Sequence, residues 1–139
     1  MKDNECVFFQ LTRLSQLAIK IWGQKVSDLN ITAIQSMILC CLYEEEGVTS
    51  IDLGKKTELE SSTVTGILDR LESACFIVRK DNPHDRRSIL IYLTEKGKIT
   101  GKELSRRREE ANKDFLKIIS KTEEKEFRRI ISLIRKQRE

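Results

Sequence analysis

The sequence predicts a mostly helical α+β fold with one small β hairpin. The first observation is that residues 76–97 contain two runs that favour β strands, joined by a basic turn that holds the only proline. The second is that two short helical segments, residues 48–56 and 61–73, precede this hairpin and are separated by a turn. Helix, turn, helix and hairpin in this order make a winged helix-turn-helix, in which the hairpin is the wing.

Two helices are predicted before the helix-turn-helix. Between Cys6 and about Val26, apolar residues recur at helical spacing, so a long first helix is expected, with an apolar face that needs a partner. Thr32 and Gln35 then form a capping box for a second helix. The core-facing residues of that helix are expected to be Ile34, Met37, Ile38, Cys41 and Leu42.

A short helix is predicted next, over residues 48–56, where Thr49 or Ser50 can cap the N-terminus. Ile51 and Leu53 are available for burial in this helix. The polar turn that follows ends it.

The next helix has the features of a recognition helix. Ser61 or Ser62 can cap it, and one apolar face is expected to pack into the core. That face consists of Val64, Ile67, Leu68 and Leu71. The opposite face is short and polar, with hydroxyl side chains near the N-terminus that suit contacts with phosphates and base edges. It consists of Ser62, Thr65, Gly66, Asp69 and Ser73, with Ser61, Thr63 and Arg70 at its margins.

Gly66 lies in the interior of this helix, where glycine costs about 1 kcal/mol relative to alanine. We interpret it as a site of close backbone approach. The alternative for the whole helix is an amphipathic core helix with no DNA-binding role. That alternative accounts for the apolar face but not for the turn and the hairpin on either side.

The hairpin has paired arms and a positive tip. Residues 76–78 form the outgoing arm, residues 89–93 the return arm, and residues 81–83 the turn between them. Its basic residues, which outnumber Asp81 and Asp85, are Arg79, Lys80, Arg86 and Arg87. Since arginine suits a narrow minor groove, Arg87 is the predicted groove contact, and Asp85 is expected to hold its guanidinium extended. The alternative is a solvated hairpin with ordinary surface charges.

Two more helices are predicted after the wing. Thr94 can cap a long helix that runs through the polar residues 102–113. Thr122 is expected to start a last helix, whose apolar face consists of Phe127, Ile130, Ile131 and Ile134. We interpret Arg106, Arg107 and Arg108 as a solvated helix face.

Length and charge agree with a single domain, residues 1–139, comprising a winged helix-turn-helix lobe at 30–98 and a helical dimerisation region at 1–29 and 99–139. A chain of 139 residues buries only a modest core, so dimerisation would supply further burial. The net charge is only +4 with 35% charged residues, which indicates local basic patches. The sequence has no apolar run of membrane-spanning length and no signal-peptide core, so a cytoplasmic protein without a membrane partner is expected.

These residues resemble the multiple-antibiotic-resistance regulator (MarR) family of bacterial and archaeal transcription factors. The resemblance covers the central half of the chain, in the segments LNITAIQ (29–35), STVT (62–65), LDRLE (68–72), DRRS (85–88) and LTEKG (93–97). Such proteins are typically homodimers held by their N- and C-terminal helices. They bind pseudo-palindromic operators, mostly as repressors that a ligand or an oxidant releases. The resemblance implies that residues 61–70 enter the major groove and that Arg87 enters the minor groove.

The predicted DNA-binding residues are Ser61, Ser62, Thr63, Thr65, Gly66, Asp69, Arg70, Arg79, Asp85, Arg86 and Arg87. Two positions depart from the family pattern. Cys75 stands where the family usually has glycine between the recognition helix and the wing, so either strain or a different helix end is expected. Gly66 stands where many relatives place a long basic residue, which removes one potential base contact.

The four cysteines, at positions 6, 40, 41 and 75, favour neither zinc nor structural disulfides. No Cys-x-x-Cys pair occurs and the single histidine, His84, lies on the wing, so no metal site is expected. Cys6, at the start of the first helix and followed by Val-Phe-Phe, resembles the organic-hydroperoxide-sensing branch of the family. In that branch such a thiol is oxidised and the dimer releases DNA. The alternative is a buried or merely exposed Cys6 without a redox role.

The predicted function is a dimeric, sequence-specific transcriptional regulator that binds double-stranded operator DNA, a repressor released by a small ligand or by thiol oxidation. An enzyme and a cofactor are not predicted, because the sequence offers no nucleophile with a plausible base and no glycine-rich phosphate loop. The alternative is a winged-helix protein-interaction module. The arginines of the wing and the polar recognition helix favour DNA, because a protein-binding wing more often presents apolar residues.

Overall fold

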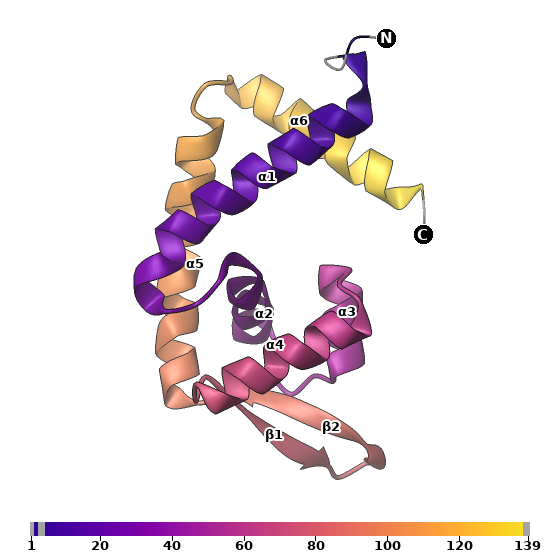
Figure 1. The fold of residues 1–139 in the computed structure, drawn as a ribbon, viewed down its shortest axis with the longest axis vertical. Helices are drawn as coiled ribbons and strands as arrows, with labels where there is room; N and C mark the ends of the chain where they lie inside the picture. Colours follow the sequence, from indigo (N-terminus) through magenta and orange to yellow (C-terminus); the bar gives the residue numbers. More distant parts are fainter. Residues whose placement is uncertain (1, 3–4, 138–139) are drawn as a thin grey trace. The chain divides into compact units, whose positions relative to one another are not determined.

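The computed structural model describes residue 2 and residues 5–137. The chain divides into two compact units, Met1–Arg107 and Arg108–Glu139. The described elements, in chain order, are α1 (Val7–Val26), the 3-10 turn η2 (Ser27–Leu29), α2 (Ala33–Glu44), α3 (Ser50–Thr57), α4 (Ser61–Ser73), β1 (Ile77–Asn82), β2 (Asp85–Leu93), α5 (Glu95–Leu116) and α6 (Lys121–Lys136) (Figure 1). The predicted fold class, mostly helical with a two-stranded wing, is confirmed. The division into units falls within α5, and the predicted lobe boundaries at 30 and 98 stay a prediction.

The starts of α2 and α3 are capped as predicted. Thr32 Oγ1 accepts from the Gln35 amide at 3.1 Å, and Gln35 Oε1 accepts from the Thr32 amide at 2.9 Å. Thr49 and Asp52 form the same reciprocal pair at the start of α3. Each capping box satisfies two amides that the first turn of a helix leaves without a partner.

Two predicted helix starts are wrong by a residue or two. The N-cap of α4 is Glu60, whose side chain makes no capping hydrogen bond, so Ser61 and Ser62 belong to the first turn. The last helix is capped by Ser120, whose Oγ accepts from the Glu123 amide at 3.1 Å, and Thr122 lies inside α6. Thr94 does cap α5 as predicted, because its Oγ1 accepts from the Gly97 amide.

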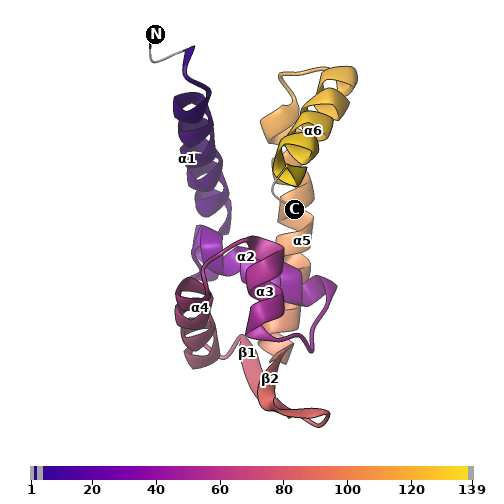
Figure 2. The ribbon, with the colours of Figure 1, turned by 90° about the vertical axis from the view of Figure 1, so that its right-hand side faces the viewer.

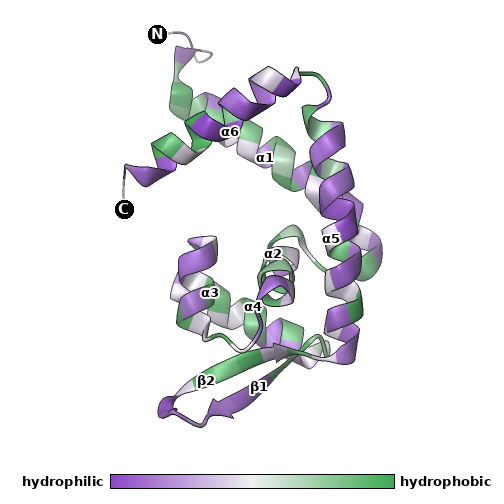
Figure 3. Cartoon of the chain, turned by 180° about the vertical axis from the view of Figure 1, so that it is seen from behind, coloured by the Kyte–Doolittle hydropathy of each residue, from purple (hydrophilic) through white to green (hydrophobic). Residues whose placement is uncertain are grey.

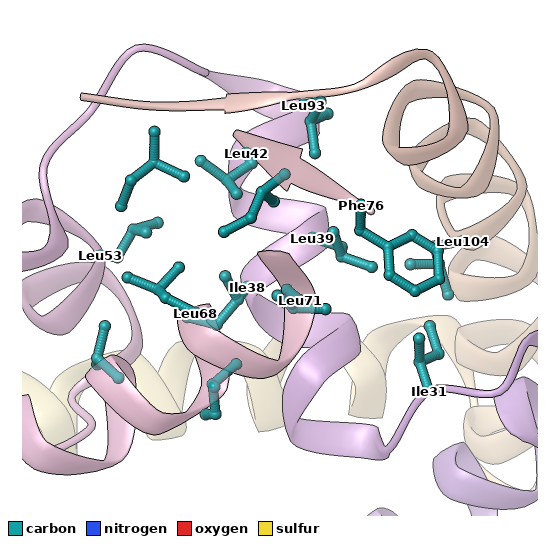
Figure 4. Close-up of a cluster of buried hydrophobic side chains, with 14 of the residues drawn as sticks. Ile31, Ile38, Leu39, Leu42, Leu53, Leu68, Leu71, Phe76, Leu93 and Leu104 are labelled. Atoms are coloured by element: carbon teal, nitrogen blue, oxygen red, sulfur yellow. The ribbon is translucent and has the colours of Figure 1, made fainter. Parts of the chain in front are cut away.

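The hydrophobic core of the first unit lies between α2, α4 and the base of the hairpin. Figure 4 shows Ile38 of α2 beside Leu68 of α4, and Leu39 of α2 beside Phe76 and Leu104. The predicted apolar face of α4 is buried in full: Val64, Ile67, Leu68 and Leu71. Burial of one such aliphatic side chain stabilises a fold by about 1.5–3 kcal/mol, so this face fixes the orientation of α4.

The other short helices differ from the predicted burial pattern. Ile34 and Met37 of α2 are exposed, and Leu39 is buried in their place. In α3, Leu53 is fully buried but Ile51 is 68% exposed. A helix of eight residues offers one turn to the core, and Leu53 occupies that turn.

A buried polar contact joins α1 to α2. Ser36 is fully buried, accepts from Trp22 Nε1 at 2.6 Å and donates to the Ala33 carbonyl at 2.6 Å. The Trp22 indole N–H and the Ser36 hydroxyl therefore both have hydrogen-bond partners, and their contact orients α1 against α2 in an otherwise apolar interface.

Arg107 anchors α5 to the junction of α1 and α2, and is not the solvated residue that was predicted. Its side chain is 18% exposed, donates to the Lys25 carbonyl at 2.8 Å and pairs with the Asp28 carboxylate. The hydrogen bond from Arg107 lowers the pKa of Asp28, and hydrogen bonds from Arg106 and Arg107 lower the pKa of Glu103 to about 2. Both carboxylates, Asp28 and Glu103, therefore stay ionised at neutral pH.

The wing is an antiparallel hairpin in which Ile77 pairs with Leu93 and Arg79 with Ile91. Figures 1 and 2 show it extending away from α2, α3 and α4. The segment before α3 is bonded to its base, since the Gly47 amide donates to the Ile91 carbonyl and the Ile91 amide to the Val48 carbonyl, both at 2.8 Å. Both strands are longer than predicted, so the tip shrinks to Pro83 and His84.

Cys75 has a φ of +64°, in the left-handed region that favours glycine. The Phe76 amide donates to the Leu71 carbonyl at 2.9 Å, and the Cys75 amide to the Glu72 carbonyl at 3.0 Å. This pattern ends α4 as a glycine would, so the predicted alternative of strain holds and that of a different helix end does not.

Replacing Cys75 with glycine is expected to stabilise the protein by about 0.5–1 kcal/mol, because relief of the left-handed strain exceeds the entropy that glycine adds to the unfolded chain. Urea unfolding followed by circular dichroism measures the change. Cys75→Ala is the matched control, since it removes the thiol and keeps the strain. Equal midpoints for the two variants would contradict this account.

Among the described residues, no single helix is long and apolar enough to cross a membrane. The one pair with sufficient combined length and composition, Val7–Leu29 with Ala33–Glu44, is bent by 75°.

Candidate nucleic-acid interface

The polar face of α4 lies on the surface of the first unit. Gly66 is half-buried, and the other residues of this face are exposed. The exposed residues are Ser61, Ser62, Thr63, Thr65, Asp69, Arg70 and Ser73. No side chain caps the first turn, so its amides are open to an incoming anion. Thr65 Oγ1 donates to the Ser61 carbonyl at 2.9 Å, which fixes the hydroxyl against its own helix.

Gly66 makes no close backbone approach within the chain, and close approach to a partner molecule stays a prediction. A Cβ built on Gly66 meets nothing within 4 Å. Position 66 therefore leaves open space on the outer face of α4, and a partner molecule can come close to the helix backbone there.

The tip of the wing is braced by two short side chains. Asn82 Oδ1 accepts from the His84 amide at 2.9 Å, and Asn82 Nδ2 donates to Ser88 Oγ at 3.0 Å. Asp85 Oδ1 accepts from the Arg87 backbone amide at 2.9 Å, not from its guanidinium as expected. These contacts hold the backbone of the tip while leaving the Arg87 side chain exposed.

The wing tip is hydrophilic along its exposed length (Figure 3). Arg86 and Arg87 are exposed at the start of β2. Further along the hairpin, Lys80 Nζ lies 4.8 Å from the centre of the Tyr92 ring, which holds that cation against the strand. Arg86 and Arg87 are therefore the guanidinium groups nearest the end of the wing, where Asp81 and Asp85 are exposed as well.

Two of the predicted DNA-binding residues are paired with each other. Arg79 Nη2 lies 2.9 Å from Asp69 Oδ1, and Arg79 Nη1 lies 3.0 Å from Glu72 Oε1. The structure thus places Arg79 at the junction of α4 and β1, apart from Arg86 and Arg87. Sequence reasoning missed Glu72, whose spacing of three residues from Asp69 on a helix was the available signal.

A groove of about 500 Å³ runs beside α4. Its walls combine apolar and polar residues from α1, α4 and the start of α2: Ile19, Thr32, Ala33, Ile34, Gln35, Ser62, Thr63, Gly66, Ile67 and Arg70. Because Ser62, Thr63 and Arg70 also belong to the polar face of α4, a molecule in this groove would touch the same residues that are predicted to bind DNA.

The cysteines lie in different environments and form no disulfide within the part of the chain that the structure describes. Cys6 is half-buried at the N-cap of α1, Cys40 and Cys41 are half-buried against the core, and Cys75 is exposed. Residue 2 and residues 5–137 contain no cluster of three or more His, Cys, Asp or Glu side chains arranged to hold a metal ion.

The arrangement matches known proteins at the level of sequence and of fold. The model of the MarR family matches residues 31–89. The organic hydroperoxide resistance transcriptional regulator of Bacillus subtilis (strain 168) is 36% identical over 99 residues, which are 71% of this chain and 67% of that protein.

Two crystal structures superpose on nearly the whole chain. The PcaV transcriptional regulator of Streptomyces coelicolor, solved with its natural ligand, has a TM-score of 0.90 at 24% identity and covers 100% of this chain and 98% of its own. A MarR mutant from E. coli in complex with operator DNA has a TM-score of 0.87 at 23% identity and covers 96% of this chain and 98% of its own. These likenesses show the shared fold, and the sequence matches show that the chain belongs to the MarR family.

Proposed function

We propose that this MarR-family transcriptional regulator binds a pseudo-palindromic operator as a homodimer, with α4 in the major groove and the wing in the minor groove. The observation that carries the proposal is that one lobe presents an exposed, short-chain polar helix face beside a braced hairpin with arginines at its end. A MarR from E. coli was solved on operator DNA, and that protein shares the fold.

The polar face of α4 suits the major groove because its side chains are short. Ser62 and Thr63 stand in the first turn, where open amides and the helix dipole favour a phosphate. The open space at Gly66 lets the helix come close to the base edges. Arg70 at the margin supplies a cation for the backbone.

The end of the wing suits the minor groove. The Asp85 and Asn82 contacts fix the tip backbone, so the Arg87 side chain can enter a narrow groove with little loss of conformational entropy. A narrow minor groove concentrates negative potential, which attracts a guanidinium.

A second copy of the chain is proposed to cover the exposed apolar faces of the terminal helices. In the first unit, α1 exposes apolar side chains along its length, with Phe8 at 81%: Val7, Phe8, Phe9, Leu11, Leu14, Leu17 and Ile19. In the second unit, α6 exposes Ile130, Ile131, Leu133 and Ile134. Exposed patches of this kind mark interfaces, and a two-fold dimer presents two recognition helices to two half-sites.

An effector is proposed to act through the groove beside α4. Its apolar wall and Arg70 suit a small amphipathic anion. A molecule held there would compete with DNA for Ser62, Thr63 and Arg70. The related fold of PcaV was solved with its natural ligand. Such a regulator acts in the cytoplasm, where bacterial and archaeal operators are accessible.

The proposed function is tested by titrating the purified protein against its own upstream intergenic DNA in a gel shift at two salt concentrations. The expected result is saturable binding that survives unrelated competitor DNA and weakens as salt rises, because phosphate contacts release counterions. Binding that competitor DNA removes at both salt concentrations would contradict it and would favour the protein-interaction module.

Oxidation of Cys6 is proposed as a second route to release, because a relative of this chain is an organic hydroperoxide resistance regulator. The Cys6 thiolate would take the outer oxygen of the peroxide to become a sulfenate, and the peroxide would leave as the alcohol. Cys6→Ser is expected to abolish release of operator by cumene hydroperoxide while leaving the affinity of the reduced protein unchanged, as measured by gel shift. Cys75→Ser, which removes the exposed thiol, is the control; release that persists in Cys6→Ser would disprove the route.

A further inference from the structure

Arg79 is placed to connect the recognition helix with the wing. Its guanidinium fork reaches two carboxylates of α4, Asp69 Oδ1 at 2.9 Å and Glu72 Oε1 at 3.0 Å. Asp69 and Glu72 are three residues apart, so both lie on one side of the helix. The Arg79 side chain is only 24% exposed, whereas those of its two partners are exposed.

The strand register directs Arg79 toward α4. Arg79 is two residues along β1 from the buried Ile77 and pairs across the sheet with the buried Ile91. Side chains two residues apart share a face of a strand, so Arg79 leaves the sheet on its core side. Arg79 lies at the boundary between the core and the surface, where its guanidinium contacts the two carboxylates of α4.

The ion pairs add to contacts that already hold the base of the wing. At the corner between α4 and β1, Thr94 Oγ1 donates to the Cys75 carbonyl at 2.6 Å and Lys96 Nζ to the Ala74 carbonyl at 2.7 Å. Arg79 adds a second attachment further along the strand. The base of the wing is also held by the hydrogen bonds of Ile91 with Gly47 and Val48, and the Arg79 ion pairs join the hairpin to α4 itself.

The charges of this cluster affect DNA as well as geometry. Asp69 and Glu72 carry two negative charges on an exposed side of the helix that is proposed to meet phosphates. Without Arg79 these charges would repel the DNA backbone, and with Arg79 one of them is compensated. The guanidinium is engaged by the helix and is less available to a phosphate than those of Arg86 and Arg87.

We propose that Arg79 is a positioning residue for operator binding, which sets the wing against α4 and shields DNA from Asp69 and Glu72, rather than a direct DNA contact. The inference rests on the proposed function. The inference states that simultaneous binding of α4 in the major groove and of the wing in the minor groove depends on the ion pairs of Arg79 with Asp69 and Glu72.

The test is a mutant cycle on operator affinity, using the full chain with Arg79→Gln, with Asp69→Asn plus Glu72→Gln, and with all three changes. Arg79→Gln alone is expected to weaken binding roughly tenfold, because it leaves two uncompensated carboxylates near phosphates. In the background without the two carboxylates, the same change is expected to weaken binding less than about threefold, since there is nothing left to shield. Arg79→Lys is expected to be intermediate, because one ammonium does not reproduce the fork.

The salt dependence separates positioning from direct contact. Removal of one phosphate contact from each protomer would lower the slope of log Kd against log salt by about 1.8 for the dimer in both backgrounds, whereas removal of a residue that acts through Asp69 and Glu72 changes the slope only while those two carboxylates are present. An equal loss of affinity in both backgrounds, together with a slope that is reduced equally in both, would overturn the inference and make Arg79 a DNA contact. Matching circular dichroism spectra and urea midpoints show that each variant is folded.

Two controls distinguish failure of this inference from failure of the proposed function. If the unmodified protein does not bind its operator specifically, the proposed function fails and the inference with it. A second outcome is that the unmodified protein binds its operator, that Arg87→Ala weakens this binding, and that the Arg79 cycle is additive. In that case only the inference fails.

Discussion

Replacing Gly97 with alanine is expected to destabilise the first unit by about 3 kcal/mol, the largest effect expected for alanine at any of the glycines. A Cβ at Gly97 would lie 2.1 Å from the Phe76 carbonyl oxygen and 3.1 Å from Leu93 Cδ2. The first of these neighbours is backbone at the start of the wing, so it cannot move without shifting β1. The first turn of α5 can pack on that backbone only through a glycine.

Urea unfolding monitored by circular dichroism measures this cost, and Gly66→Ala is the matched control. Both glycines lie in helices, but a Cβ at Gly66 meets nothing within 4 Å. Gly66→Ala is therefore expected to stabilise the protein by up to about 1 kcal/mol through helix propensity alone. A Gly97→Ala variant as stable as Gly66→Ala would show that α5 does not pack on the Phe76 carbonyl as described.

Replacing Arg87 with alanine is expected to weaken operator binding by about 1–3 kcal/mol, or roughly five- to 150-fold in Kd. The change removes the exposed guanidinium from the end of the wing, while the Asp85 contact to the backbone amide remains possible. The fold and the dimer are expected to be unaffected, because the side chain packs against no core residue and is exposed. Fluorescence anisotropy with labelled operator gives the affinity.

Arg106→Ala controls for the loss of one positive charge. Arg106 is exposed on α5 and paired with Glu103, so its removal changes net charge without touching the wing. If Arg87→Ala and Arg106→Ala weaken operator affinity equally, the effect of Arg87→Ala comes only from the change in net charge. That result would contradict the assignment of Arg87 to the minor groove.

Features set by neighbours in the sequence could be predicted well. The capping box of Thr32 with Gln35 joins residues three apart, the cap at Thr49 was one of two predicted caps, and the apolar face of α4 follows from helical spacing alone. The strain at Cys75 was predicted as one of two alternatives from its place after a helix. Each of these depends on local geometry, which composition and spacing encode.

Features set by tertiary contacts could not be predicted. Arg107 was assigned to solvent because its partner Asp28 lies 79 residues earlier in the chain. Close approach within the chain occurs at Gly97, which the sequence did not single out, and not at Gly66. Likewise Arg79 was grouped with the wing arginines, although the side chain faces Asp69 and Glu72 of the preceding helix.

The central claim is that each winged helix-turn-helix lobe binds the major groove with α4 and the minor groove with the wing. Hydroxyl-radical footprinting of the operator, with the unmodified protein and with Arg87→Ala, tests this claim most directly. The account predicts two protected segments about one helical turn apart, flanked by protected minor-groove sugars. At concentrations that saturate the operator, Arg87→Ala should lose only the flanking protection, because α4 still occupies the major groove. Flanking protection that survives in Arg87→Ala, or central protection that disappears with it, would contradict the assignment of α4 and the wing to separate grooves.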